Sequence, residues 1–218
     1  MKPLVPAGLI AILCSGIASA GVIYSNFGAG QTFAGGVGLT PAFSAVASSF
    51  TPDATYSVDE YQIAAFRASP DTPDTVTFSL YSDANGVPGA DIESFTLSGL
   101  GYPAGNDFSE STPPPGILSE DSPTNPVLEA GQQYWLVMSG INPGDVTWND
   151  DGNGQTGAAA QNPDNSWTLL PNYSQGAFEI DGTLASDAAP EPASFLMLAG
   201  GLAAIVLLAR QSLVLVTK

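Results

Sequence analysis

The sequence predicts an all-β fold, an antiparallel β-sandwich of the jelly-roll type, for the central part of the chain. Short segments alternate polar and apolar residues with period two, and Gly, Pro, Asn and Asp punctuate them. No amphipathic helical stretch of ten or more residues stands out there. The clearest alternation places Val76, Phe78 and Leu80 on one face of a strand. Many short strands separated by turn residues are typical of two-sheet folds.

In chain order, we expect strands at 61–66, 75–81, 95–97, 133–138, 146–148, 166–169 and 177–180. The segment 133–138 is more continuously apolar, which predicts a central strand. Turns are expected at 83–86, 142–145 and 150–154, where Gly, Asn and Asp cluster. Residues 101–126 are expected to form a loop because they carry three consecutive prolines.

The first 20 residues have the pattern of a secretory signal peptide. Lys2 is followed by an apolar stretch at 4–17 and by the small residues Ala18 and Ala20, which frame a cleavage site. The mature chain is therefore expected to begin at Gly21, after export through the Sec translocon. Cys14 follows a leucine, whereas a lipoprotein signal requires a small residue there, so we expect no acylation.

The C-terminal region contains 17 uncharged residues at 193–209. As a helix they would extend about 25 Å, close to the lower limit for crossing a bilayer. Arg210 and Lys218 follow the run, so the tail is predicted to be cytoplasmic and the central domain exported. Two alternatives remain open. The span could continue through 213–216, or the run could be a buried helix of a soluble domain.

The order of Pro190, Glu191, Pro192, an apolar run and Arg210 resembles the PEP-CTERM sorting signal of Gram-negative bacteria. That resemblance implies recognition by exosortase, a membrane processing enzyme, with the tripeptide as recognition element and Arg210 as the stop. It implies a protein first anchored in the inner membrane, facing the periplasm, and then released to the outer surface or extracellular matrix. The tail differs from the family pattern in having one arginine rather than a cluster.

The predicted domain boundaries are 1–20 for the signal peptide, 21–181 for the ectodomain, 182–189 for a linker and 190–218 for the sorting segment. Residues 21–189 carry 20 acidic residues and a single cation, Arg67, hence a net charge of −19. A surface this negative repels nucleic acid and anionic lipid. The same segment has no His and no Cys, which excludes Ser-His-Asp and Cys-His catalysis and histidine zinc sites. We therefore expect no enzymatic activity and no cofactor other than a weak Ca²⁺ site.

The middle of the chain resembles choice-of-anchor R domains, which are found in exported bacterial proteins. The residues that carry the likeness are Leu80-Tyr81-Ser82-Asp83, Gly86-Val87-Pro88-Gly89 and the strand from Leu128 to Val137. The likeness spans about residues 45–180. It implies a β-sandwich ectodomain with no established activity, so it transfers no functional residues.

Two weak binding sites are candidates. Asp145, Asp150, Asp151 and Asn153 crowd a Gly-rich segment and offer the oxygen ligands that Ca²⁺ prefers, although a hydrophilic turn is the simpler explanation of them. Trp148 and Trp167 could stack on the sugars of exopolysaccharide, with core packing as the alternative. The sequence thus predicts a non-enzymatic surface or matrix protein. The alternative is a carbohydrate- or calcium-binding module of the exopolysaccharide matrix.

Overall fold

The structure is a computed structural model that describes residues 20–38, 43–102, 116–139 and 145–185. These residues belong to the first of two compact units, 1–185, and the second unit is 186–218. The described residues form thirteen strands and no helix. The strands are β1 (Gly21–Ser25), β2 (Phe33–Gly38), β3 (Ala45–Phe50), β4 (Tyr56–Arg67), β5 (Thr75–Asp83), β6 (Pro88–Ser98), β7 (Ile117–Asp121), β8 (Val127–Leu128), β9 (Tyr134–Ser139), β10 (Val146–Asp151), β11 (Thr156–Gln161), β12 (Trp167–Ser174) and β13 (Phe178–Leu184).

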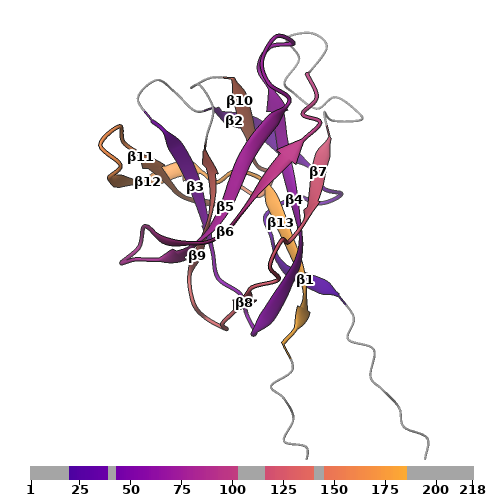
Figure 1. Ribbon diagram of the computed structural model, residues 1–218, viewed down its shortest axis with the longest axis vertical. Coiled ribbons are helices and arrows are strands. Elements are labelled where there is room, and N and C mark those ends of the chain that lie inside the picture. Colours follow the sequence, from indigo (N-terminus) through magenta and orange to yellow (C-terminus); the bar gives the residue numbers. More distant parts are fainter. Residues whose placement is uncertain (1–19, 39–42, 103–115, 140–144, 186–218) are drawn as a thin grey trace, which may run out of the picture. The chain divides into compact units, whose positions relative to one another are not determined.

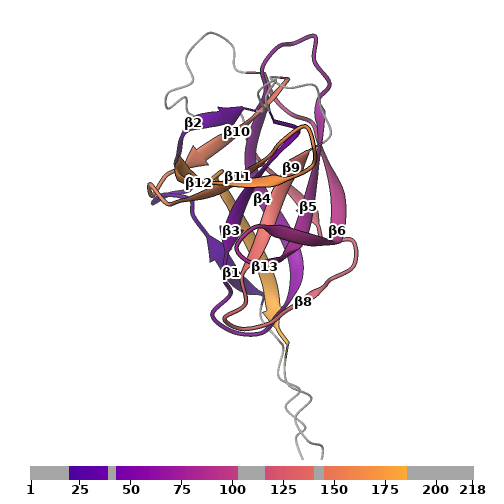
Figure 2. The same ribbon diagram turned by 90° about the vertical axis from the view of Figure 1, so that its left-hand side faces the viewer.

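The strands make two antiparallel sheets (Figures 1 and 2). The first has the order β1-β13-β4-β10-β2, and β7 and β8 also pair with the long strand β4. The second has the order β12-β11-β3-β9-β5-β6. The predicted all-β, antiparallel class is therefore confirmed. Each of the seven predicted strands overlaps a strand of the structure, three of them beginning one residue too early, and β9 is central, between β3 and β5.

Two boundary predictions were wrong. Residues 101–126 do not form one continuous loop, because β7 lies within them and pairs with β4 from Ile117↔Ala64 to Asp121↔Glu60. The linker does not begin at residue 182, because Gly182 to Leu184 continue β13 and pair with β4. In both places the pairing partner is β4, a strand of 12 residues that is long enough to pair with several other strands.

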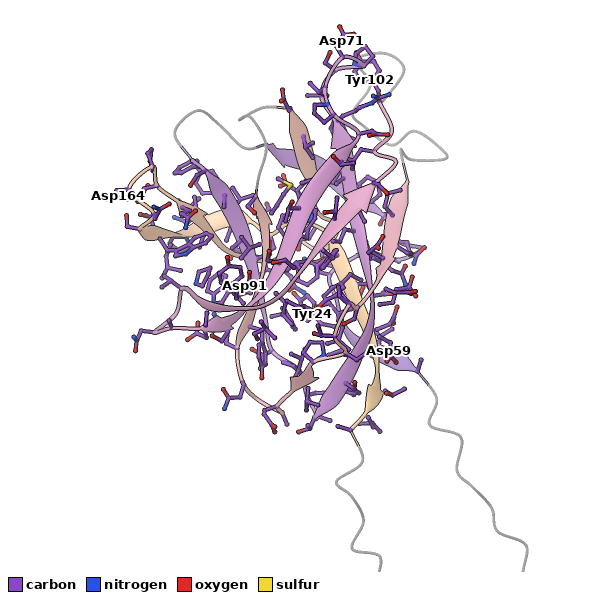
Figure 3. The ribbon with its side chains drawn as sticks, in the orientation of Figure 1. Tyr24, Asp59, Asp71, Asp91, Tyr102 and Asp164 are labelled. Carbon is purple, nitrogen blue, oxygen red and sulfur yellow. The ribbon has the colours of Figure 1, made fainter. Side chains whose placement is uncertain are left out.

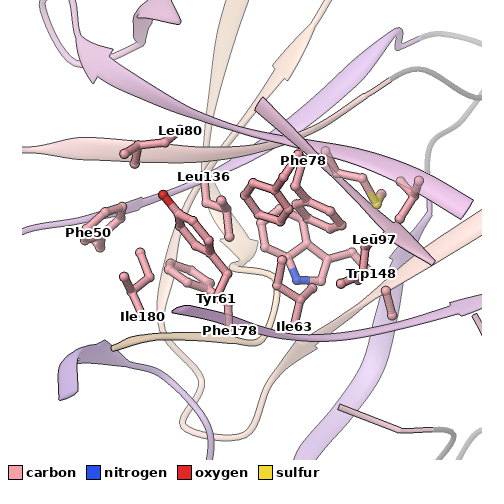
Figure 4. Packing of buried hydrophobic residues seen from close by; sticks show 14 of the residues in the cluster. Phe50, Tyr61, Ile63, Phe78, Leu80, Leu97, Leu136, Trp148, Phe178 and Ile180 are labelled. Carbon is pink, nitrogen blue, oxygen red and sulfur yellow. The ribbon is translucent and has the colours of Figure 1, made fainter. Parts of the chain in front are cut away.

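One large hydrophobic core is shared by the two sheets (Figure 4). Ile63, Trp148 and Phe178 come from the first sheet, and Phe78 and Leu136 come from the second; all five are 0–1% exposed. The Trp148 ring meets Phe78 edge-on, with centroids 5.0 Å apart, and lies 5.9 Å from Phe178. Edge-to-face aromatic pairs of this kind add stability beyond the area that they bury.

The β5–β6 hairpin shows how local sequence sets the strand register. Asn85 and Gly86 both have positive φ, 60° and 84°, and Ala84 donates its N–H to the Val87 carbonyl. Asn-Gly is the preferred pair for a type I′ turn because both central residues need positive φ. The turn predicted at 83–86 is therefore confirmed.

Candidate functional site

Trp148, one of the two predicted stacking residues, is part of the core. It is 1% exposed, and its Nε1–H donates to the Ala177 carbonyl at 3.0 Å. Gly176 packs directly on its ring, since a Cβ at that position would lie 2.2 Å from two ring carbons. Its proposed role in binding sugar is thus contradicted, because a ligand cannot reach the indole.

Trp167, the second predicted stacking residue, lies on the face of its sheet that points away from the main core. It is half-buried and packs against a second apolar cluster, Ala45, Ala47, Trp135, Val137 and Ala159. The alternating residues of the same strands, such as Val46 and Leu136, belong to the main core. The second cluster therefore covers the outer face of the β12-β11-β3-β9-β5-β6 sheet.

The four predicted calcium ligands do not come together. Asp145 precedes β10, and its carbonyl accepts hydrogen bonds from Ala68 and Thr72. Asp151 ends the same strand, roughly 20 Å away at about 3.3 Å per residue. The Asn153 side-chain amide donates to the carbonyls of Asn26 and Phe27. Among the described residues, no three Asp, Glu, His or Cys side chains are grouped closely enough to hold a metal ion.

Asp150 and Asp151 nevertheless occupy an unusual environment. Each has a buried Oδ1 atom without a hydrogen-bond partner, and so does Asn149. Burial raises the pKa of both carboxyl groups, and the charge of Asp151 raises that of Asp150 further. Backbone N–H donors of Gln155 and Gly154 partly offset the effect at Asp151. The pairing of β10 with β2 is irregular between Asn149 and Asp151, and Asp150 bridges Gly176 there.

A buried polar network that the sequence did not predict lies beside these carboxylates. Gln175, 4% exposed, accepts hydrogen bonds at Oε1 from the Tyr24 hydroxyl at 3.0 Å and from the Asn26 amide at 3.5 Å. Its own amide donates to the Ser49 carbonyl at 2.8 Å. Asn26 is fully buried and accepts from the Phe178 N–H. These hydrogen bonds connect residues that are 126 to 152 positions apart in the chain. The network therefore holds the end of β1 against the segment that joins β12 to β13.

A second buried acid, Glu93, is fully paired. Its carboxylate accepts from the Tyr61 hydroxyl at 2.5 Å, from the Ser122 hydroxyl at 2.8 Å, and from the hydroxyl and N–H of Thr124 at 2.7 and 3.1 Å. Burial, followed by the hydrogen bond and charge of Glu93, raises the Tyr61 pKa far above its ordinary value, so this hydroxyl stays a donor. Glu93 therefore holds the segment between β7 and β8 against β4 and β6.

Charge is distributed unevenly over the two sheets. The adjacent strands β12, β11, β3 and β9 contain no Asp, Glu, Lys or Arg at all. By contrast, acidic residues occur in β4, β7, β10 and β13 of the other sheet and in β5 and β6. Of the acids labelled in Figure 3, Asp59 lies on β4, Asp91 on β6 and Asp71 in a loop, whereas Asp164 lies in the turn that joins β11 to β12. The domain thus has a four-strand uncharged surface.

The residues predicted for sorting lie mostly outside the described part of the chain. This holds for Ala18, Pro190, Glu191, Pro192 and Arg210. Ala20 and Gly21 are described, and Gly21 is the first residue of β1. No helix within the described ranges has the length and apolar character needed to span a membrane.

Comparison of the chain with known protein families and with curated proteins found no match.

Proposed function

We propose that this chain is an exported, non-enzymatic protein of the cell surface or extracellular matrix, sorted by a PEP-CTERM and exosortase system. The start of β1 is the main support. The first strand begins at Gly21, the residue that cleavage after Ala20 would make the new N-terminus. Within the described residues, the first strand therefore begins directly after the proposed cleavage site.

The other end of the domain fits the same proposal. Gly21 pairs with Gly182, so the first and last strands lie side by side and β13 ends at Leu184. The tripeptide Pro190-Glu191-Pro192 follows six residues later in the sequence. Prolines lack an N–H and hold the chain extended, which suits a segment that a processing enzyme must grip. The domain itself, on this proposal, is a β-sandwich of the jelly-roll kind.

The residue composition of the domain and the pairing of its buried acid support a non-enzymatic role. The segment 21–189 lacks His and Cys, and the buried carboxylate of Glu93 is engaged by hydrogen-bond donors. A catalytic acid would need a position that substrate can reach.

Expression of the full chain in a Gram-negative host, with and without an exosortase, tests the proposal. N-terminal sequencing should give Gly21 as the first residue, and exosortase should convert the membrane-bound form to a shorter one. Glu191→Ala should block that conversion, while Asp187→Ala, a nearby acid outside the tripeptide, should not. Full-length chain with both ends intact in the cytosol would refute the proposal.

A further inference from the structure

The outer edge of the uncharged surface carries an exposed apolar stripe. Trp167, Leu169, Pro171 and Tyr173 alternate along β12. Leu169 is 48% exposed and Tyr173 60% exposed, Pro171 is exposed, and Trp167 is half-buried against the second cluster. Leu169 pairs with Ala159 of the second cluster and Trp167 packs on that cluster, so both lie on the outer face of the sheet. Pro171 and Tyr173 follow beyond the register shift and are exposed. We call these four residues the β12 stripe.

We propose that the β12 stripe binds an uncharged polysaccharide. Pyranose rings present faces of C–H bonds that pack on aromatic faces, and their hydroxyl groups bond to polar side chains at the ring edge. Gln161 is the ladder partner of Trp167, so its side chain lies on the same face, close to the indole. A narrow stripe of rings and aliphatic groups matches a long, thin ligand rather than a globular one.

The charge distribution favours a neutral ligand. In a domain with a net charge of −19, the 13 residues from 165 to 177 include no charged group. An acidic polysaccharide would be repelled by the domain as a whole, and a cationic one would find its ion pairs on other strands. Only an uncharged chain gains from stacking here without an electrostatic cost.

A second copy of the same chain is a poorer occupant. Pro171 offers no N–H, and the register of β12 with β11 shifts between Leu170 and Ser174, so the strand edge is irregular. Both features oppose pairing with another strand.

Affinity electrophoresis of the full chain in detergent tests the inference, with hydroxyethylcellulose and dextran as neutral polymers and alginate as an acidic one. A neutral polymer should retard the protein, and alginate should not. Tyr173→Ala should weaken retardation about fivefold, the loss expected for one aromatic contact. Leu169→Asn, which removes an apolar contact, should weaken it as well. These residues are exposed, so the variants should keep the wild-type melting temperature; Trp167→Ala serves as a third variant if it folds.

The matched control is Tyr102→Ala. Tyr102 is 42% exposed and follows β6, whereas Tyr173 lies on β12, and these two strands are the opposite edges of the second sheet. This variant should bind as the wild type does. Equal losses in Tyr102→Ala and Tyr173→Ala, or no retardation by either neutral polymer, would overturn the inference. A dimer in sedimentation that Tyr173→Ala dissociates would assign the stripe to a second copy instead. None of these outcomes depends on exosortase processing, so the sorting proposal is tested separately.

Discussion

Removal of the Tyr61 hydroxyl is the most direct test of how this domain holds a buried charge. Glu93 is 5% exposed and Tyr61 is fully buried, and their hydrogen bond is 2.5 Å long. Tyr61→Phe keeps the ring, which stacks on Phe95 at 4.4 Å, and deletes only the donor. The variant therefore isolates one hydrogen bond to a buried carboxylate.

The expected cost is large for a single atom. Hydrogen bonds to charged groups contribute about 1.5–3 kcal/mol, and because the Glu93 carboxylate is buried, water does not replace the lost donor. In a domain of this size 1 kcal/mol lowers the melting temperature by about 2–4 °C, so the loss should be about 3–12 °C. Thermal unfolding followed by circular dichroism, together with urea titration, measures it.

Tyr56→Phe is the matched control. Its hydroxyl also donates to a carboxylate, Asp53, at 3.0 Å, but this pair is exposed to solvent. Water replaces the lost partner, so the melting temperature should stay within the scatter of repeated scans. If Tyr61→Phe loses no more stability than Tyr56→Phe, the carboxylate of Glu93 does not depend on its buried donor and the reasoning is refuted. A Tyr61→Phe, Thr124→Val double variant should show non-additive losses, because both donors serve one acceptor.

Two further predictions concern the β10 region. Gly176→Ala should destabilise the domain by about 1–3 kcal/mol, because its Cβ would lie 2.2 Å from the Trp148 ring. The control is Gly35→Ala, whose Cβ would meet no atom within 4 Å and which should have little effect. Equal losses of melting temperature in the two variants would contradict this packing. Asp150→Asn should raise the melting temperature at pH 7, because the folded state raises the Asp150 pKa and its charged form is disfavoured there. The sign follows from proton linkage: the folded state binds the proton more tightly, so the penalty is present above the raised pKa and disappears as the pH falls below the ordinary value of 3.8. Asp164→Asn should show the opposite sign, because hydrogen bonds from Ser166 lower the Asp164 pKa; a gain for both variants would contradict the burial argument.

The sequence predicted strands where side-chain pattern and turn chemistry agree. β5 alternates clearly and is followed by the Asn85-Gly86 turn, and β9 is apolar from Tyr134 to Met138, so both were found. β2, with the sequence FAGGVG, and β11, with TGAAAQ, have almost no pattern, because glycine and alanine carry no strong preference for strands. These strands exist because their neighbours pair with them, which is tertiary information.

The candidate sites were harder to predict than the strands. Composition showed that oxygen ligands crowd residues 145–153, but not that β10 separates Asp145 from Asp151. The burial of Trp148 depends partly on Gly176, which packs on the indole ring from the segment between β12 and β13. Trp167 was a candidate from the sequence, but the uncharged surface around it could be recognised only once β12, β11, β3 and β9 were known to be neighbours.

The pairing of β1 with β13 has a consequence for the timing of folding. In the described part of the chain β1 finds its ladder partner in β13, the last strand to be synthesised, and β13 in turn reaches the central strand β4. Contacts between residues so distant in sequence form slowly. The pairing of β1 with β13 cannot form before β13 has been synthesised, so the first sheet is completed late, after local hairpins such as β5–β6 can already have formed.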